Sequence, residues 1–203
     1  MTLRLLTAFC FMLMLLPGGQ AQVDYQLAGE SAITIHGTST LHDWKAVVPG
    51  YEGIFKIADD LVKKKLKEGA AIEKAMLKFE VETIDGGRGP SMNKKIKTAL
   101  KSDEHPQIVF ELDEPTKVER ITSKDNEKFT MKAAGVLSIA GTSQDITLDL
   151  EGQRMENGQF HFKTKKPLKM SDFEIEPPSA MFGQIVTKDD IEVDFDLILT
   201  IKN

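Results

Sequence analysis

Alternation of apolar and polar residues with a period of two restricts the fold of this chain more than any other feature. The clearest run spans residues 190–202, where Val193, Phe195 and Leu197 alternate with acidic residues. Since successive side chains of a strand point to opposite faces, such a run is typical of a strand with one buried face. Comparable runs lie at 30–37, 42–48, 52–58, 73–84, 107–122, 127–140, 143–154 and 159–168. The pattern predicts an all-β fold of about eight or nine strands, the lower number applying if 42–48 and 52–58 form one long bent strand.

Short turn sequences separate several of these runs. Asp125-Asn126, Gly141-Thr142-Ser143 and Asn157-Gly158 fall between four consecutive strand candidates. Connections this short join antiparallel neighbours, so a meander is expected. A long sheet must protect its edges, and closure into an antiparallel barrel removes them. The interior of a barrel of about eight strands is either filled by side chains or able to hold one small ligand.

Helix signals are sparse. Ser91 follows a Gly-rich stretch and is predicted to cap a short helix that carries Met92, Ile96 and Leu100 on one face. A second helical turn is expected within residues 60–67.

The first 21 residues differ from the rest. Arg4 precedes an apolar run, and Gly19 and Ala21 occupy the −3 and −1 positions of a cleavage site before Gln22. This layout is that of a secretory signal peptide, and a run of about 12 apolar residues is too short to span a bilayer. We therefore expect residues 1–21 to be removed and residues 22–203 to form a single domain in the periplasm or outside the cell, without a transmembrane anchor.

Composition excludes several kinds of site. The only cysteine, Cys10, lies in the predicted signal peptide, so the remainder is expected to hold no disulfide and no cysteine metal site. A net charge of −5 argues against nucleic acid as the partner. A metal site is not expected either, because no two histidines are spaced three or four residues apart; they are His36, His42, His105 and His161.

One polar segment, residues 37–44, invites an enzymatic interpretation. Ser39 would be a nucleophile and His42, followed by Asp43, its base. Neighbouring residues of a strand point to opposite faces, however, and no Gly-x-Ser-x-Gly sequence surrounds the serine. A turn whose polar side chains bond backbone groups, with Trp44 packed inward, is the favoured interpretation. No catalytic residue is predicted.

Inward positions of the predicted strands carry large apolar side chains that would line a hollow barrel: Ile35, Trp44, Phe55, Phe79, Phe110, Met131, Leu137, Leu148, Phe162, Phe195 and Leu197. The residues predicted to surround its mouth are Arg88, Met92, Lys94, Lys95, Phe173, Met181 and Phe182. The basic members of the second group either form a solvated face or meet an anionic head group. The apolar members of the 170–183 loop must pack, either as a plug in one end or as a lid over a ligand.

Two motifs carry a resemblance to a known family. Residues 100–110 read Leu-Lys-Ser, an acidic pair, His-Pro and a strand ending in Phe, and residues 135–141 read Gly-x-Leu-x-Ile-x-Gly. With these motifs the chain resembles the YceI-like family of exported lipid- or polyisoprenoid-binding proteins over nearly all of residues 22–203. Residues 37–44 and 177–183 are similar to one branch of that family.

The chain also departs from the family pattern. Ala140 stands where many members have a histidine, and the insert at 59–69 is longer and more basic than the resemblance leads us to expect. The resemblance implies a lipocalin-like antiparallel β-barrel and no transferable catalytic residues.

The resemblance implies non-catalytic binding, carriage or sequestration of a long-chain lipid such as an isoprenoid, a quinone or a polyprenyl phosphate. Burial of ten carbons would contribute about 8 kcal/mol before the cost of association. No resident cofactor is expected, although an isoprenoid or fatty-acid-like ligand would co-purify. We also expect transient contact of the protein with a membrane surface. Its expected oligomeric state is a monomer or a homodimer. Two alternatives stay open: an enzyme that acts on such a lipid with His42 and Asp43, and a stress-response or interaction module with a filled core.

Overall fold

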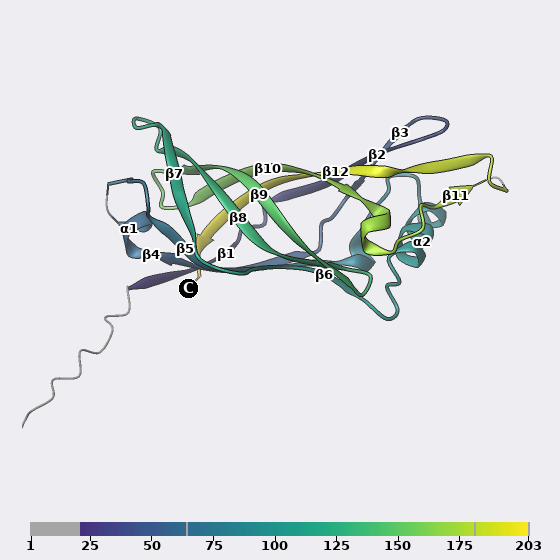
Figure 1. Ribbon diagram of the computed structural model, residues 1–203, viewed down its shortest axis with the longest axis horizontal. Coiled ribbons are helices and arrows are strands. Elements are labelled where there is room, and N and C mark those ends of the chain that lie inside the picture. Colours follow the sequence, from purple (N-terminus) through teal and green to yellow (C-terminus); the bar gives the residue numbers. More distant parts are fainter. Residues whose placement is uncertain (1–20, 64, 181, 203) are drawn as a thin grey trace, which may run out of the picture.

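The computed structural model describes residues 21–63, 65–180 and 182–202, and the described residues form twelve strands, eight of which make a closed barrel (Figure 1). The strands are β1 Gln22–Leu27, β2 Ala32–Ser39, β3 Asp43–Val47, β4 Tyr51–Ala58, β5 Ala71–Glu80, β6 Gln107–Leu112, β7 Thr116–Ser123, β8 Lys128–Ile139, β9 Thr142–Arg154, β10 Phe160–Lys169, β11 Ser179–Ala180 and β12 Ile185–Ile201. The helices are α1 Asp59–Val62 and α2 Pro90–Ala99, with 3-10 turns η1 Val81–Thr83 and η2 Met170–Phe173. Residues 1–20 of the predicted signal peptide lie outside the described residues.

Eight of these strands close on themselves. Their order is β1-β4-β5-β6-β8-β9-β10-β12, and Tyr25–Leu27 of β1 completes the circle by pairing antiparallel with Leu199–Ile201 of β12. The remaining length of β12 pairs with β2, which in turn pairs with β3. All of the ladders are antiparallel, and closure leaves the central sheet without free edges. The predicted all-β antiparallel barrel is confirmed.

The strand boundaries correct three details of the prediction. β3 and β4 are separate strands that pair with different neighbours, so the single bent strand over 42–58 is wrong. The run at 107–122 is divided into β6 and β7 by a bend that ends at Pro115, which has no N–H for a ladder. β1 at Gln22–Leu27 was not predicted, although it closes the barrel.

The two helices lie at opposite ends of the barrel, which we call the α1 end and the α2 end (Figure 1). α2 begins with Pro90 at its first position after Gly89, whose φ of 82° suits glycine. The predicted cap at Ser91 is therefore wrong, because proline with its fixed φ starts the helix one residue earlier. The predicted turn within 60–67 is present as α1, shifted to Asp59–Val62.

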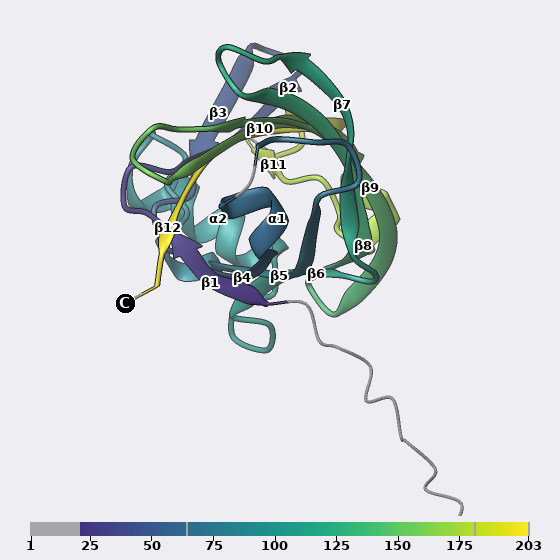
Figure 2. The same cartoon turned by 90° about the vertical axis from the view of Figure 1, so that its left-hand side faces the viewer.

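The α1 end is filled. Seen from this end, α1 lies within the ring of strands (Figure 2). Leu61 of α1 is fully buried, as are Tyr25 and Phe160, whose rings meet edge to face with centroids 5.4 Å apart. Phe129 and Phe162 form a second edge-to-face pair at 5.9 Å. The insert at 59–69 thus supplies the side chain that plugs one end of the barrel.

One arginine fastens α1 in this position. The Arg154 guanidinium donates to a Glu127 carboxylate oxygen over 2.6 Å and to the backbone carbonyls of Leu61 and Val62 over 2.8 and 3.0 Å. Carbonyls in the last turn of a helix lack partners within the helix, so this contact satisfies them. The hydrogen bonds from Arg154 to the Glu127 carboxylate hold the pKa of Glu127 below its usual range.

Candidate functional site

An apolar cavity of about 160 Å³ lies at the α2 end; we call it the outer cavity. α2 forms one side of it, β2 and β3 form another, and the segment that begins with η2 closes a third. Its apolar lining includes Ile33, Ile35, Trp44, Ala46, Val48, Met92, Ile96, Ala99, Leu100, Ile108, Ile139, Met170, Phe173, Ile175, Ile191 and Val193. The amphipathic α2 directs its apolar face into this space, because Met92, Ile96 and Ala99 recur at helical spacing.

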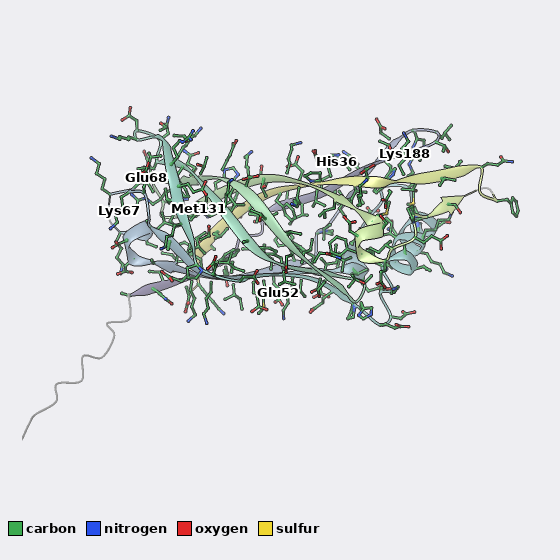
Figure 3. All side chains as sticks on the ribbon, in the orientation of Figure 1. His36, Glu52, Lys67, Glu68, Met131 and Lys188 are labelled. Carbon is green, nitrogen blue, oxygen red and sulfur yellow. The ribbon has the colours of Figure 1, made fainter. Side chains whose placement is uncertain are left out.

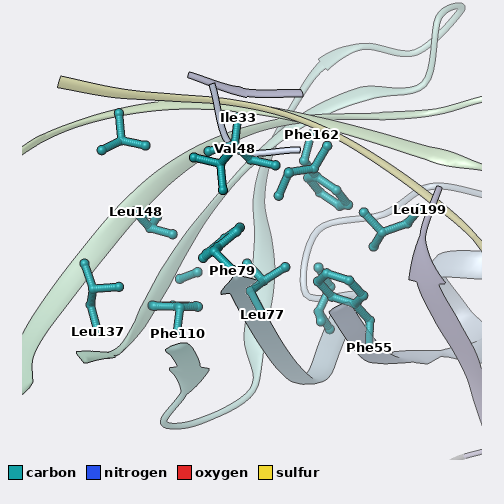
Figure 4. Close-up of a cluster of buried hydrophobic side chains, with 14 of the residues drawn as sticks. Ile33, Val48, Phe55, Leu77, Phe79, Phe110, Leu137, Leu148, Phe162 and Leu199 are labelled. Carbon is teal, nitrogen blue, oxygen red and sulfur yellow. The ribbon is translucent and has the colours of Figure 1, made fainter. Parts of the chain in front are cut away.

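A second apolar cavity, of about 60 Å³, lies deeper in the barrel, and we call it the inner cavity. Its side chains project from β4 to β10 and from β12, and several are visible in Figure 4. They include Phe55, Ile72, Ala75, Leu77, Phe110, Leu112, Ala133, Ile146, Leu148, Leu150, Phe162, Leu197 and Leu199.

Four side chains line both cavities, and we call them the waist: Phe79, Leu137, Leu168 and Phe195. Phe79 and Phe195 face one another with ring centroids 6.0 Å apart and planes inclined by 48°. Figure 4 places Phe79 near the centre of the buried cluster. The two cavities are therefore neighbours in one interior, divided by aromatic and leucine side chains.

The predicted lining agrees with this interior except at one position. Ile35 and Trp44 line the outer cavity, Phe79, Leu137 and Phe195 the waist, and the others the inner cavity: Phe55, Phe110, Leu148, Phe162 and Leu197. Met131 lines neither cavity.

Met131 is almost fully buried and pairs with Val118 of β7 and Leu150 of β9, toward the α1 end (Figure 3). Its assignment to the tunnel was wrong, because the packed core occupies the barrel there.

The predicted mouth residues divide into two groups. Met92, Lys95 and Phe173 line the outer cavity, and the Lys95 ammonium donates to the Ser179 carbonyl over 3.0 Å. Arg88 precedes α2 and, like Lys94, is exposed and lines neither cavity. A head group beside the outer cavity would meet Lys95 and Lys169 rather than these two cations.

The 170–183 loop behaves differently along its length. Phe173 is buried beneath the outer cavity, whereas Phe182 is fully exposed, at 109% of its reference area. The prediction that Phe182 packs as a plug or lid is therefore wrong, and Met181 lies outside the described residues. Phe173 packs because η2 turns it inward directly after the inward-facing end of β10.

Thr164 is the functional candidate that the sequence prediction missed. It lines the inner cavity at an inward position of β10, two residues beyond Phe162. The inward alternation of Phe160, Phe162 and Thr164 contained the necessary signal, since a polar residue in an otherwise apolar series is conspicuous.

The Ser39 segment forms a turn. The Ser39 hydroxyl donates to the His42 carbonyl over 2.8 Å and accepts from the backbone N–H of Leu41 and of His42 over 3.3 and 3.2 Å. The Trp44 indole N–H donates to the Thr38 carbonyl over 3.1 Å, and its ring lines the outer cavity. The predicted structural turn with an inward tryptophan is confirmed.

The described residues offer neither a cluster of metal ligands nor a membrane-spanning helix. In that part of the chain no group of three or more histidine, cysteine, aspartate or glutamate side chains is placed to hold a metal ion. Neither described helix has the length and apolarity needed to cross a bilayer.

Comparison with solved structures identifies the fold. A polyisoprenoid binding domain from Saccharophagus degradans superposes with a TM-score of 0.66 at 14% identity, covering 89% of this chain and 99% of that one. Burkholderia cenocepacia BcnA gives a TM-score of 0.63 at 16% identity, with 84% and 97% covered. The Campylobacter jejuni YceI protein gives 0.54 at 18% identity, with 78% and 84% covered.

The search of curated proteins returned no match. The model of the YceI-like domain, by contrast, matches residues 28–199, which include every strand of the closed barrel except β1 and the last residues of β12. This protein therefore belongs to the YceI-like family.

Proposed function

We propose that this protein binds a long-chain amphiphilic lipid of the isoprenoid type and carries or sequesters it without altering it chemically. The observation that supports the proposal is the pair of adjoining apolar cavities along the barrel. Apart from Gly86 and Pro178, their remaining lining residues are three threonines and three lysines: Thr116, Thr164, Thr187, Lys95, Lys166 and Lys169. Such an interior attracts hydrocarbon through the hydrophobic effect and needs no catalytic group to do so.

The size of the cavities sets how much of a chain they accept. An apolar cavity of about 150 Å³ binds benzene, so the outer cavity has room for about six carbons and the inner cavity for fewer. At about 0.8 kcal/mol per methylene, filling both contributes roughly 7 kcal/mol before the cost of association. A longer chain requires α2 to move outward, and α2 is suited to this because none of its side chains is fully buried.

The α2 end also carries apolar side chains in solvent, which favours exchange with a membrane over permanent storage. Leu41 is 66% exposed between β2 and β3, and Phe182 and Val186 are exposed near the start of β12. Two hydrogen bonds join the β2–β3 turn to the start of β12. The Thr40 N–H donates to the Val186 carbonyl over 3.0 Å, and the Val186 N–H donates to the Thr40 hydroxyl over 3.2 Å. Apolar tips beside a lipid cavity fit an interfacial contact.

The predicted export signal gives this proposal its compartment. We propose that the mature protein acts in the periplasm or outside the cell, with the lipid as its only resident ligand. A carrier there would take up lipid at a membrane surface and hold the chain away from water.

Extraction and titration test the proposed function. Protein purified without detergent is extracted with organic solvent and analysed by mass spectrometry, and the delipidated protein is titrated with geranylgeraniol. We expect a lipid near equimolar amount and saturable binding. Absence of both would overturn the proposal.

Two tryptophan variants locate the binding. Ile96→Trp fills the outer cavity and should abolish the titration signal. Ile54→Trp, on the outer face of β4 where Ile54 is 49% exposed, is the matched control and should bind as the wild type does. Equal binding by both variants would place the lipid outside the barrel.

A further inference from the structure

Thr164 has a buried hydroxyl without a partner. The residue is 8% exposed, and its Oγ1 has no hydrogen-bond partner among the described residues. It points into the inner cavity from β10 and pairs across the ladder with Phe195 of the waist. The hydroxyl therefore lies in the apolar interior directly inside the waist.

An unpaired hydroxyl in such a place is unfavourable. Leaving a polar group buried without a partner costs stability, whereas valine would fill the same volume without that cost. The other inner-cavity hydroxyl is satisfied, because Thr116 donates to the carbonyl of Lys132. The Lys166 ammonium is also engaged, donating to the Thr147 carbonyl over 3.0 Å. Thr164 is thus the group of this wall that still requires a partner.

A buried water is the competing candidate for that partner. Such a water is held by two to four polar groups. Thr164 would supply one of them, and Thr116, whose hydrogen is already donated, would add only a lone pair. Lys166 is the remaining polar residue of this lining, so the polar end of a lipid has the advantage that its chain also fills the apolar interior.

We propose that the Thr164 hydroxyl hydrogen-bonds an uncharged polar group at the inner end of the bound lipid, which enters the barrel polar end first. The proposal rests on the proposed lipid-binding function and specifies the ligand further. The inner cavity of about 60 Å³ has room for a hydroxyl, aldehyde or carboxamide group but not for a ring, since benzene needs about 150 Å³. A phosphate is disfavoured at this position, because its charge would be buried among apolar side chains and the cation of this lining, Lys166, already donates to the Thr147 carbonyl. The ligand class is therefore a long-chain alcohol, aldehyde or amide whose chain passes the waist into the outer cavity.

Two substitutions separate the hydroxyl from the shape of the side chain. Thr164→Val keeps the branched shape and removes the hydroxyl, and Thr164→Ser keeps the hydroxyl. The probes are farnesol and farnesene, an isoprenoid alcohol and a related hydrocarbon, each measured by displacement of N-phenyl-1-naphthylamine fluorescence. We expect Thr164→Val to bind farnesol about threefold to tenfold more weakly and farnesene unchanged, and Thr164→Ser to retain its preference for farnesol.

The ligand-free protein supplies a second readout. Removal of an unsatisfied hydroxyl should raise the Tm of Thr164→Val by about 2 to 4 °C. A lower Tm would show that the hydroxyl already has a partner and would overturn the inference.

The outcomes distinguish this inference from the proposed function. Equal farnesol affinity in the wild type and Thr164→Val, with both binding, overturns the role of Thr164 and leaves lipid binding intact. Failure of the wild type to bind either probe overturns both proposals. Parallel weakening of both probes in Thr164→Val would assign the residue a packing role and also overturn the inference.

Discussion

The two ends of the barrel are built from similar parts and do opposite things. Each has a short helix laid against the strands, yet α1 buries Leu61 completely and α2 buries no side chain fully. At the α1 end aromatic rings interlock and an arginine bonds the helix carbonyls. At the α2 end the side chains stop short of one another and leave the outer cavity.

This difference separates stability from ligand binding along one axis. A helix packed into a filled core adds buried area and opens only with the whole fold, whereas a helix over a cavity opens at small cost. A lipid-binding barrel needs both properties, since the open end must yield without loss of the closed one. Substitutions at the α1 end should therefore change mainly the free energy of unfolding, and substitutions at the α2 end mainly lipid binding.

The largest expected effect is the removal of an aromatic ring from the α1 end. Phe160→Ala should lower the free energy of unfolding by about 4 kcal/mol, because Phe160 is fully buried between Tyr25 and Phe162. Ile96→Ala in α2 should cost less than about 1.5 kcal/mol, since Ile96 already adjoins empty space and alanine favours helix. Urea unfolding measures both, and equal losses would refute the division between the ends.

Removal of the Arg154 contact is expected to have the next largest effect, with a characteristic dependence on pH. Arg154→Met should lower the free energy of unfolding at pH 7 by about 2 kcal/mol, which is less than for a fully buried pair because the Glu127 side chain is one-third exposed.

The sign of the pH dependence follows from Glu127. Its pKa lies below the usual 4.5 because Arg154 hydrogen-bonds the carboxylate. Stability from a lowered pKa is fully present above the usual value and is lost as the pH falls through the lowered one. The gap between wild type and Arg154→Met should therefore narrow in acid below about pH 4, as followed by urea unfolding across pH. A gap that stays constant would mean that the pair does not fasten α1 electrostatically.

The waist connects the two ends, and Phe79→Ala should change chain-length preference. Removal of this ring widens the passage between the cavities, so a chain can advance by about two carbons more, each worth about 0.8 kcal/mol. The affinity for geranylgeraniol should rise about tenfold relative to that for geraniol. Phe110→Ala enlarges the inner cavity alone and is the control, because its ring is not part of the waist. An equal change of the ratio in Phe110→Ala would show that volume matters and the constriction does not.

The fold was more predictable from the sequence than the site was. Period-two alternation identified β8, β9, β10 and β12, because each buries one face along a long ladder. β1 was missed although it shows the same pattern: Val23, Tyr25 and Leu27 alternate with Gln22, Asp24 and Gln26 and pack into the core. The inward set was predicted as one tunnel, but alternation gives only the face of a residue and not its height along the axis.

Because the height of a residue along the barrel axis was unknown, the prediction failed at particular residues. Met131 and Leu137 share one face of β8, yet only Leu137 reaches a cavity. Phe182 was expected to pack because it is aromatic, but its exposure depends on where the loop returns to β12. Depth and loop path are set by tertiary contacts that no local pattern contains.

The smallest expected effect is on membrane partition, when exposed apolar side chains are removed from one end of the barrel or the other. Leu41 and Phe182 line neither cavity, so a Leu41→Ser/Phe182→Ser variant should keep its solution affinity for farnesol. Its partition onto vesicles of phosphatidylethanolamine and phosphatidylglycerol should fall about fivefold, because two side chains no longer enter the interface. Met155 provides the matched control, since it is a large exposed apolar residue that follows Arg154 at the α1 end. Met155→Ser should leave partition unchanged if only the α2 end meets the membrane. An equal loss for Met155→Ser in a vesicle sedimentation assay would show that the protein has no preferred face and that its open end is not where lipid is exchanged.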